Sequence, residues 1–365
     1  PHLHTPNMDD LAKYGVRFTQ SYCTSPVCSP SRSSLITGRM PHNTGVNYND
    51  EELNPGIRTM GEYFREEGYN TVWAGKWHLP ENYPHTTMEE VGGFELVDFL
   101  DEEELSGLGD ITDKPLGDAA ARHLGRRISE PFLMVASFHN PHDICYLPQK
   151  PSAYPPPANL ESAPPLPDNF RVSSREPEFI TDARTRTSYG NEIALTRDFT
   201  GADWQNYLHH YYRMVERVDR EIGKLLDALE SRGYDQNTWI IFTSDHGDGA
   251  AAHQWAAKLS LYQESVSVPF IIAHFGMEPN GMVNDRHLVS GIDVLPTFMD
   301  LAGMEIPVEI QGKSIRSILE NPDTTWRQYL VTELAIDPQD TTVAGRMITD
   351  GRYKYMVYSY GARNE

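Results

Sequence analysis

The 365-residue sequence has few cysteines and few basic residues, and both shortages exclude classes of protein. Cys23, Cys28 and Cys145 are too few for a disulfide framework, and no Cys-x-x-Cys pair indicates a zinc ribbon. Lys and Arg number 31 against 52 Asp and Glu, so the formal net charge is −21 at pH 7. Nucleic acids and anionic membranes need a basic face on their partner, so this charge argues against both. A small anionic substrate is still compatible with this net charge, because the field of a local cluster of cations can exceed that of a distant acidic surface.

Long apolar runs and targeting signals are also absent. No stretch of 18 consecutive apolar residues occurs, so the sequence predicts no transmembrane helix. There is no secretory leader and no Asn-x-Ser/Thr sequon. The opening residues 1–4 do not resemble a native start, and mature chains lose their leaders. A periplasmic or secreted bacterial location therefore remains the expectation.

Apolar runs of strand length alternate with amphipathic helical patterns along the chain. This alternation predicts an α/β fold with a mostly parallel central sheet flanked by helices. Strands are predicted over 70–74, 132–138, 239–243 and 268–273. Helices are predicted over 203–232, ending at Gly233, and over 293–301.

Two segments depart from this alternation. Eight prolines between 148 and 167 predict an extended loop, either a substrate-binding wall or a plain connector. Beyond residue 322, two further strands are predicted over 329–333 and 353–358. We therefore expect a main domain over 1–322 and the beginning of a small α+β subdomain over 323–365.

Polar side chains follow three of the predicted strands directly. They are Lys76 and His78 after 70–74, His139 and His142 after 132–138, and Asp245, His246, Asp248, His253 and Lys258 after 239–243. In open α/β sheets, ligands bind at the carboxyl ends of the strands. Three such clusters on one edge predict a shared site.

A fourth contribution is a short helix predicted between Pro30 and Gly38. Proline suits the first turn of a helix, and glycine suits its end. Cys28 then lies at the helix N-terminus, where free N–H groups favour an anion and lower the pKa of a thiol. Arg32, one turn further, offers a forked donor to the same anion. Alternatively, Cys28 is a buried, inert cysteine.

The segment 28–39 reads Cys-x-Pro-Ser-Arg-x-x-x-x-Thr-Gly-Arg. It closely resembles the signature of the type I sulfatases of the alkaline-phosphatase-like superfamily, in which a maturation enzyme converts the cysteine to formylglycine. The resemblance extends over essentially the whole chain. Segment 5–12 looks like the family's early helix, segment 75–78 like its Lys-x-His element, and segment 141–142 like its Pro-His element. Segment 244–248 looks like its metal-binding turn, and segment 258–265 like the element that carries its distal lysine. It implies the fold and the sulfuric ester hydrolase activity of that family.

The resemblance implies a role for each matching residue around the nucleophile. Cys28 would be the formylglycine precursor, whose aldehyde hydrates to a geminal diol. Arg32 and Lys76 would steady the diol and the sulfate, and His78 would take a proton from the second hydroxyl. These roles agree with the chemistry, because attack on an anionic ester needs cations around its oxygens.

Further roles follow for the leaving group and for a metal. His142 and Lys258 would protonate the leaving oxygen. Asp245 and His246, together with modified Cys28, would bind a divalent cation, calcium in most relatives. Relatives also carry two adjacent aspartates at the end of a first strand, and this sequence lacks that strand. At the C-terminus, relatives end with a further strand and helix that this sequence also lacks. We therefore expect that the sequence is trimmed at both ends and that the first strand supplies the remaining ligands.

Two other functions stay open. The first is a phosphonate monoester or phosphodiester hydrolase of the same superfamily, and the second is a sulfoglycan-binding pseudoenzyme. The cations Arg32, Lys76 and Lys258 favour a sulfate ester, carried by a sulfated carbohydrate or an aryl group. The intact Cys28 signature argues against a pseudoenzyme.

Several residues near the predicted site have no role in the family pattern. We expect His139 to orient its loop, whereas His253 has two open roles, contact with the substrate or a structural part. Four aromatic residues are candidates for stacking on a substrate or for packing: Trp77, Tyr83, Tyr146 and Trp255.

Overall fold

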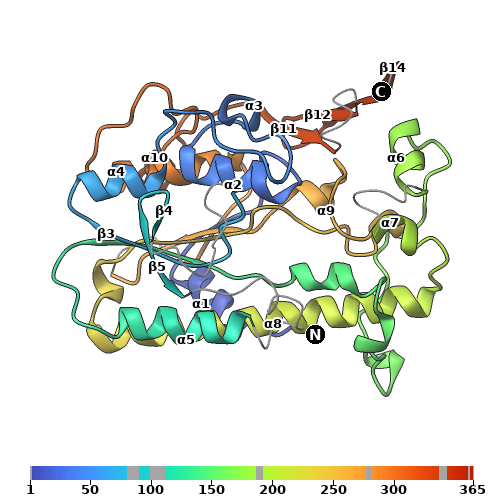
Figure 1. Cartoon of the computed structure of the whole chain (residues 1–365), viewed down its shortest axis with the longest axis horizontal. Coiled ribbons are helices and arrows are strands. Elements are labelled where there is room, and N and C mark those ends of the chain that lie inside the picture. The colour runs from blue at the N-terminus through green and yellow to red at the C-terminus, as the bar shows by residue number, and fades with distance from the viewer. Residues whose placement is uncertain are drawn as a thin grey trace.

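Two four-stranded sheets form the centre of the chain (Figure 1). The computed structural model describes residues 2–79, 90–98, 112–185, 192–276, 281–336, 343–360 and 362–364. One sheet has the order β7 (Ile240–Thr243), β8 (Phe270–Ala273), β1 (Gly15–Phe18) and β9 (Met282–Asn284). The other has the order β4 (Glu90–Val91), β5 (Phe94–Asp98), β3 (Asn70–Gly75) and β6 (Phe132–Ser137).

The α/β class is confirmed, and all four predicted strands of the main domain are present. Two of the three strand pairs are parallel in the sheet β4-β5-β3-β6, whereas the other sheet has one parallel pair and two antiparallel pairs. β3 pairs in parallel with β5 and β6, and β1 with β9, whereas β8 is antiparallel to both β1 and β7. The prediction assumed helical crossovers between successive strands. An antiparallel pair needs none. Between β7 and β8 the chain forms only the short helices η7 (Ala252–Gln254) and α9 (Gln263–Val266), so this connection is free to carry site residues.

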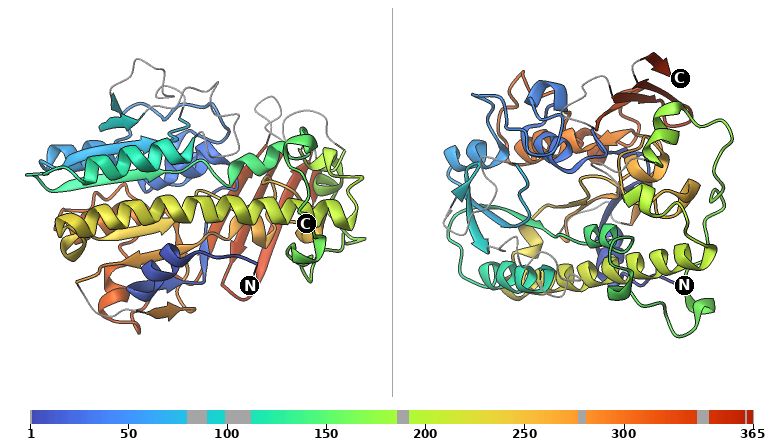
Figure 2. Two further views of the ribbon diagram at one scale, coloured as in Figure 1. Left: turned by 90° about the horizontal axis from the view of Figure 1, so that it is seen from below. Right: turned by 45° about the vertical axis from the view of Figure 1, so that its right-hand side comes forward.

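Helices cover the sheets on both sides (Figure 1). The first group is α1 (Pro6–Lys13), α5 (Asp113–Leu124) and α8 (Gly201–Arg232), and Figure 2 shows α8 running alongside α5. The opposite group is α2 (Cys28–Thr37), α4 (Met60–Glu66) and α10 (Val294–Leu301). As predicted, α2 ends at Gly38 and α8 at Gly233, both in the left-handed conformation, with φ of 66° and 70°. The shorter helices are α3 (Pro41–Thr44), η3 (His142–Tyr146), α6 (Glu178–Ala183), α7 (Glu192–Leu195), η6 (Asp235–Asn237), η8 (Gly291–Asp293) and α11 (Arg316–Glu320).

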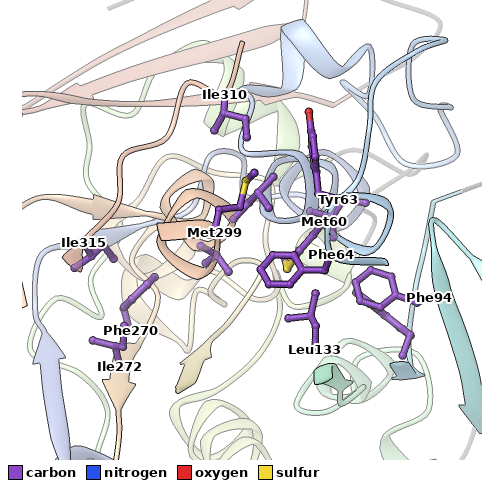
Figure 3. Close-up of a cluster of buried hydrophobic side chains, with 14 of the residues drawn as sticks. Met60, Tyr63, Phe64, Phe94, Leu133, Phe270, Ile272, Met299, Ile310 and Ile315 are labelled. Carbon is purple, nitrogen blue, oxygen red and sulfur yellow. The ribbon is translucent and has the colours of Figure 1, made fainter. Parts of the chain in front are cut away.

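A cluster of buried apolar side chains joins α4 and α10 to both sheets (Figure 3). Its labelled members are Met60, Tyr63, Phe64, Phe94, Leu133, Phe270, Ile272, Met299, Ile310 and Ile315. Burying one such side chain stabilises the fold by ~1.5–3 kcal/mol. Ile36 of α2 belongs to the same cluster, so the core fixes the helix that carries Cys28.

A cavity of about 1420 Å³ lies between β6 and β7. It is lined by residues 132–138 along β6 and 239–244 along β7. Among the described residues, β6 pairs only with β3 and β7 only with β8. Each strand therefore has one edge without a strand partner in the described chain, and the cavity extends along both strands.

The C-terminal part of the described chain forms a separate antiparallel sheet of β11 (Leu330–Ala335), β12 (Ala344–Thr349), β13 (Lys354–Tyr360) and β14 (Ala362–Asn364). β11 and β13 match the two predicted strands. This small C-terminal β subdomain lies within the predicted segment 323–365, whose described residues contain no helix. The domain boundary at 322 stays a prediction.

Two further segments complete the described fold. β2 (Ser21–Tyr22) pairs in parallel with β10 (Val289–Ser290). The proline-rich segment 148–167 is irregular apart from the short turns η4 (Pro151–Ala153) and η5 (Leu160–Ser162). In the described residues no helix has the length and apolar character needed to cross a membrane.

Candidate active site

Helix α2 begins at Cys28, and the hydroxyl groups of its first turn attach it to the loops that follow β3 and β7. Ser29 Oγ donates a hydrogen bond to the carbonyl oxygen of His78 at 2.6 Å. Ser31 Oγ donates to the carbonyl oxygen of Asp245. Ser29 and Ser31 thus hold three chain segments together around Cys28.

Three basic groups surround the thiol of Cys28. Lys258 Nζ lies 2.6 Å from the sulfur, His246 Nε2 3.3 Å and Lys76 Nζ 3.7 Å. Burial opposes ionisation of the fully buried thiol, but Lys258, Lys76 and His246 together hold the pKa of Cys28 well below its ordinary value. The position therefore favours an anion or an electron-rich oxygen.

Arg32 connects the ends of β3, β6 and β7. Its Nε forms an ion pair with Asp245 Oδ2 at 2.9 Å, and its Nη1 donates to the carbonyl oxygen of Lys76 at 2.7 Å and to Ser137 Oγ at 3.0 Å. Burial would raise the pKa of Asp245, but His246 and Arg32 hold it below its ordinary value. Through these contacts Arg32 holds the ends of the three strands together, in addition to any contact that it makes with a substrate.

His78 reaches the site because the chain turns sharply after β3. Gly75 has a φ of 94° and His78 a φ of 59°, both in the left-handed region. A Cβ atom at Gly75 would collide with Leu116 and with the carbonyl oxygen of Ser137, so this position needs glycine. Burial lowers the pKa of His78, and the neighbouring Cys28 opposes that shift.

The loop after β6, which carries His139 and His142, is held by Asp113 at the start of α5. The carboxylate of Asp113 accepts hydrogen bonds from His139 N at 2.6 Å, Asn140 N at 3.0 Å and Asn140 Nδ2 at 2.7 Å. Burial raises the pKa of Asp113. Three donors on one buried carboxylate fix the backbone just before His142.

His142 lies in the positive field of the site. Burial and the charge of Lys76 lower the pKa of its imidazole to about 3, with a further contribution from Lys258, whereas Asp143 opposes the shift. The free site thus keeps His142 neutral at neutral pH. A bound anion would offset the lysines and favour the imidazolium.

The structure brings all the predicted site residues together at the carboxyl ends of β3, β6 and β7. Those that line the cavity are Arg32, Lys76, His78, His139, His142, Asp245, His246 and Lys258. Cys28 lies directly behind them, in contact with Lys258, Lys76 and His246. A substrate at this end of the cavity would meet the cations Arg32, Lys76 and Lys258.

The remaining candidates separate into packing and lining residues. The ring of His253 stacks on Tyr262 with centroids 4.4 Å apart and does not line the cavity, which favours its structural role. Trp77 and Trp255 are buried, and Trp255 Nε1 donates to the carbonyl oxygen of Lys258 at 2.9 Å. Tyr146 lines the cavity. The candidate Tyr83 lies outside the described residues.

Sequence reasoning missed two buried carboxylates that support the site, Asp113 and Asp143, and it placed Asp248 at the site without assigning it a role. The Oδ atoms of Asp248 accept hydrogen bonds from the hydroxyl of Tyr207 at 2.9 and 3.0 Å and from Ala250 N at 2.7 Å, so this residue ties the loop after β7 to α8. Burial raises the pKa of Asp248. Asp143 is adjacent in sequence to the predicted residue His142, and that proximity is the only signal that marked it.

Cys28, Asp245 and His246 place one ligand atom each within 4.8 Å of one another. A hard cation such as Ca²⁺ takes six to eight oxygen ligands, and this set offers one carboxylate, one imidazole and one sulfur. The same sulfur contacts two lysines. The described residues therefore fit part of a divalent-cation site and not a complete shell.

Comparisons with known proteins agree with this arrangement. A model of the family described as Sulfatase matches residues 1–304, and a model described as N-sulphoglucosamine sulphohydrolase, C-terminal, matches residues 251–364. The chain belongs to the sulfatase family. It is 30% identical to a Delta 4,5-hexuronate-2-O-sulfatase of Bacteroides thetaiotaomicron, over 98% of this chain and 76% of that protein. The sulfatase assignment made from the Cys28 motif is confirmed, and the chain is a sulfuric ester hydrolase.

Solved structures support the same fold. A structure described as a 2-O GAG sulfatase superposes with a TM-score of 0.85 at 29% identity, covering 99% of this chain and 79% of that one. The phosphonate monoester hydrolase of Agrobacterium radiobacter superposes with a TM-score of 0.82 at 23% identity, covering 99% and 83%. The second likeness concerns the fold alone. The alkaline-phosphatase-like fold predicted from the sequence is confirmed.

Proposed function

We propose that this sulfatase removes a sulfate group from a sulfated carbohydrate, with a nucleophile made from Cys28 by conversion to formylglycine. The observation that carries the proposal is the position of Cys28, at the first residue of α2 and within reach of Lys258, Lys76 and His246. An inert structural cysteine needs no basic groups around it. A nucleophile that attacks an anionic ester does need such groups, because they neutralise the charge of the ester.

The proposed roles follow from the placement of the side chains. Lys76 and Lys258 neutralise the sulfate oxygens, and Arg32 holds Asp245 and the strand ends in register. His142, with Lys258, gives a proton to the leaving oxygen when the S–O bond of the ester breaks. His78 then takes a proton from the second hydroxyl at position 28, so that the carbonyl group re-forms as sulfate departs.

A divalent cation, most simply Ca²⁺, would be held by Asp245 and His246 beside position 28, and it would supply polarisation of an S–O bond. The shortage of oxygen ligands among the described residues agrees with the prediction that a further strand contributes carboxylates.

A sulfated sugar is favoured over an aryl sulfate because two relatives near 30% identity are named as a hexuronate-2-O-sulfatase and an N-acetylglucosamine-6-O-sulfatase. The proposed test compares turnover of sulfated unsaturated uronate disaccharides, 4-nitrophenyl sulfate and phenyl phosphonate esters. Highest kcat/KM on a sulfated disaccharide is expected. Preference for the phosphonate esters would overturn the proposal and support the alternative hydrolase.

The proposed partner for maturation is a formylglycine-generating enzyme, and the proposed location is the periplasm or the exterior of a bacterial cell. Both come from the family resemblance and from the bacterial source of the relative named above. Cell fractionation of the producing organism with an antibody to this chain tests the location. Recovery of the chain with cytoplasmic markers alone would overturn it.

A further inference from the structure

Asp143 is a buried carboxylate between two imidazoles of the same loop. Its Oδ1 lies 3.1 Å from His139 Nε2 and 3.6 Å from His142 Nδ1, and its side chain is 1% exposed. The two imidazole rings lie 4.6 Å apart at 61°. The carboxylate thus faces one nitrogen of each ring.

The orientation of His142 leaves its other nitrogen for the cavity. Nδ1 is buried on the side of Asp143, whereas 24% of the side chain is exposed and lines the cavity. Nδ1 forms no hydrogen bond within the described part of the chain, but it faces the carboxylate, so that a proton on Nδ1 would be directed at Asp143 and Nε2 would face a ligand. A carboxylate behind an imidazole fixes both its tautomer and its orientation.

The ion pairs of Asp143 are confined to these imidazoles among the residues that the structure describes. Burial raises the pKa of Asp143, but His139 and His142 more than offset it and hold the pKa below its ordinary value. A buried carboxylate of this kind favours a proton on a neighbouring imidazole. Asp143 therefore favours the protonated form of a neighbouring histidine.

The groups that face His142 divide into two sets. Lys76, from the segment after β3, and Lys258, from the loop after β7, disfavour its imidazolium, and so does His139. Asp143 favours it. An anionic ester in the cavity would offset the lysines, and Asp143 would then decide whether His142 carries its proton.

We propose that Asp143 is a positioning residue that orients and charges His142 for protonation of the leaving oxygen, with His139 fixing the carboxylate. The proposal rests on the acid role of His142 in the proposed function. In the step concerned, the proton on His142 Nε2 passes to the ester oxygen as its bond to sulfur breaks. His142 is left neutral, with Nδ1–H still directed at Asp143.

The test is Asp143→Asn, assayed with phenyl sulfate, which has a poor leaving group, and with 4-nitrophenyl sulfate, which has a good one. Loss of acid catalysis costs ~10²–10⁴ in rate. We expect a fall of about 10²-fold or more in kcat/KM for phenyl sulfate and less than about 10-fold for 4-nitrophenyl sulfate. The basic limb of the pH–rate profile should move to lower pH, because imidazolium without its carboxylate loses its proton more readily.

Asp113→Asn is the matched control, since it removes a buried carboxylate that holds the same loop through backbone donors. It should leave the pH limb in place, because Asp143 still faces His142 in this variant. In a His142→Gln background, adding Asp143→Asn should cause little further loss, because the two changes remove one function. Equal losses on both esters with an unmoved pH limb, or full additivity with His142→Gln, would overturn the proposal.

Two measurements cover other outcomes. If Asp143→Asn does not fold, Asp143→Ala is assayed with added formate, which should restore turnover of phenyl sulfate selectively; equal recovery with both esters contradicts the proposal. The titration of His142, followed by NMR with inorganic sulfate present, should shift to lower pH in Asp143→Asn. An unchanged titration counts against the role of Asp143, whereas a wild-type protein that hydrolyses no sulfate ester counts against the proposed function.

Discussion

Lys258 Nζ lies 2.6 Å from Cys28 Sγ, although 230 positions separate the two residues in the chain. Lys258 belongs to the connection between the antiparallel strands β7 and β8, and Cys28 is the first residue of α2. Trp255 holds the backbone of Lys258 through Nε1. The fold thus delivers a cation to the helix N-terminus from a segment without regular structure.

Replacing His142 by alanine should slow poor leaving groups much more than good ones. Acid catalysis contributes ~10²–10⁴-fold, and it matters most where the departing oxygen is basic. Steady-state kinetics on a series of substituted phenyl sulfates measures the effect as a steeper dependence on leaving-group pKa. An unchanged slope would show that His142 is not the acid.

Replacing His78 by alanine should stall the second half of the reaction. Without a base for the second hydroxyl, sulfate release slows, and enzyme carrying sulfate at position 28 should accumulate with either kind of ester. Intact-protein mass spectrometry after mixing with 4-nitrophenyl sulfate detects the adduct. If sulfated protein is absent and the leaving-group dependence resembles that of His142→Ala, the roles are misassigned.

Asp245→Asn should weaken divalent-cation binding and lower turnover by a factor of about 10² or more, on the scale of one lost transition-state electrostatic contact. The change removes the one carboxylate among the three convergent donors and breaks the ion pair with Arg32. Elemental analysis of active wild-type protein and of the variant measures the metal. Active wild-type protein without a divalent cation would contradict the metal proposal.

The stability of the ligand-free protein should decrease as the pH falls below 6.5. The folded state holds the pKa of His142 at about 3, against an ordinary value of 6.5, so the unfolded chain binds more protons between these values. Each unit by which the pH falls in that window then lowers the free energy of unfolding by about 1.4 kcal/mol through this group. Urea unfolding of wild type and of His142→Gln at several pH values measures it. The free energy of unfolding should fall more steeply with decreasing pH in the wild type than in His142→Gln. The same pH dependence in both proteins would contradict the lowered pKa of His142.

Local sequence patterns predicted much of the site because its residues follow strands directly. Lys76, His142 and Asp245 come just after apolar runs that form β3, β6 and β7. The Cys28 motif predicted both the helix and its termini, since proline and glycine have local conformational preferences. These features depend on neighbouring residues and are therefore visible in one sequence.

The features that depended on distant contacts were not predictable. Strand β1 pairs with β8, more than 250 positions away, and nothing in the apolar run 268–273 indicates its antiparallel direction. Asp113 supports His139 and Asn140 from the start of α5, yet an acidic residue in the first turn of a helix is ordinary. Its role appears only when the loop after β6 is placed beside it.

The most direct test of the central claim is the mass of the Cys28 peptide in a preparation that hydrolyses a sulfate ester. The account predicts that the active protein carries the aldehyde of formylglycine at position 28. Active protein whose Cys28 peptide carries only the unmodified thiol would contradict it.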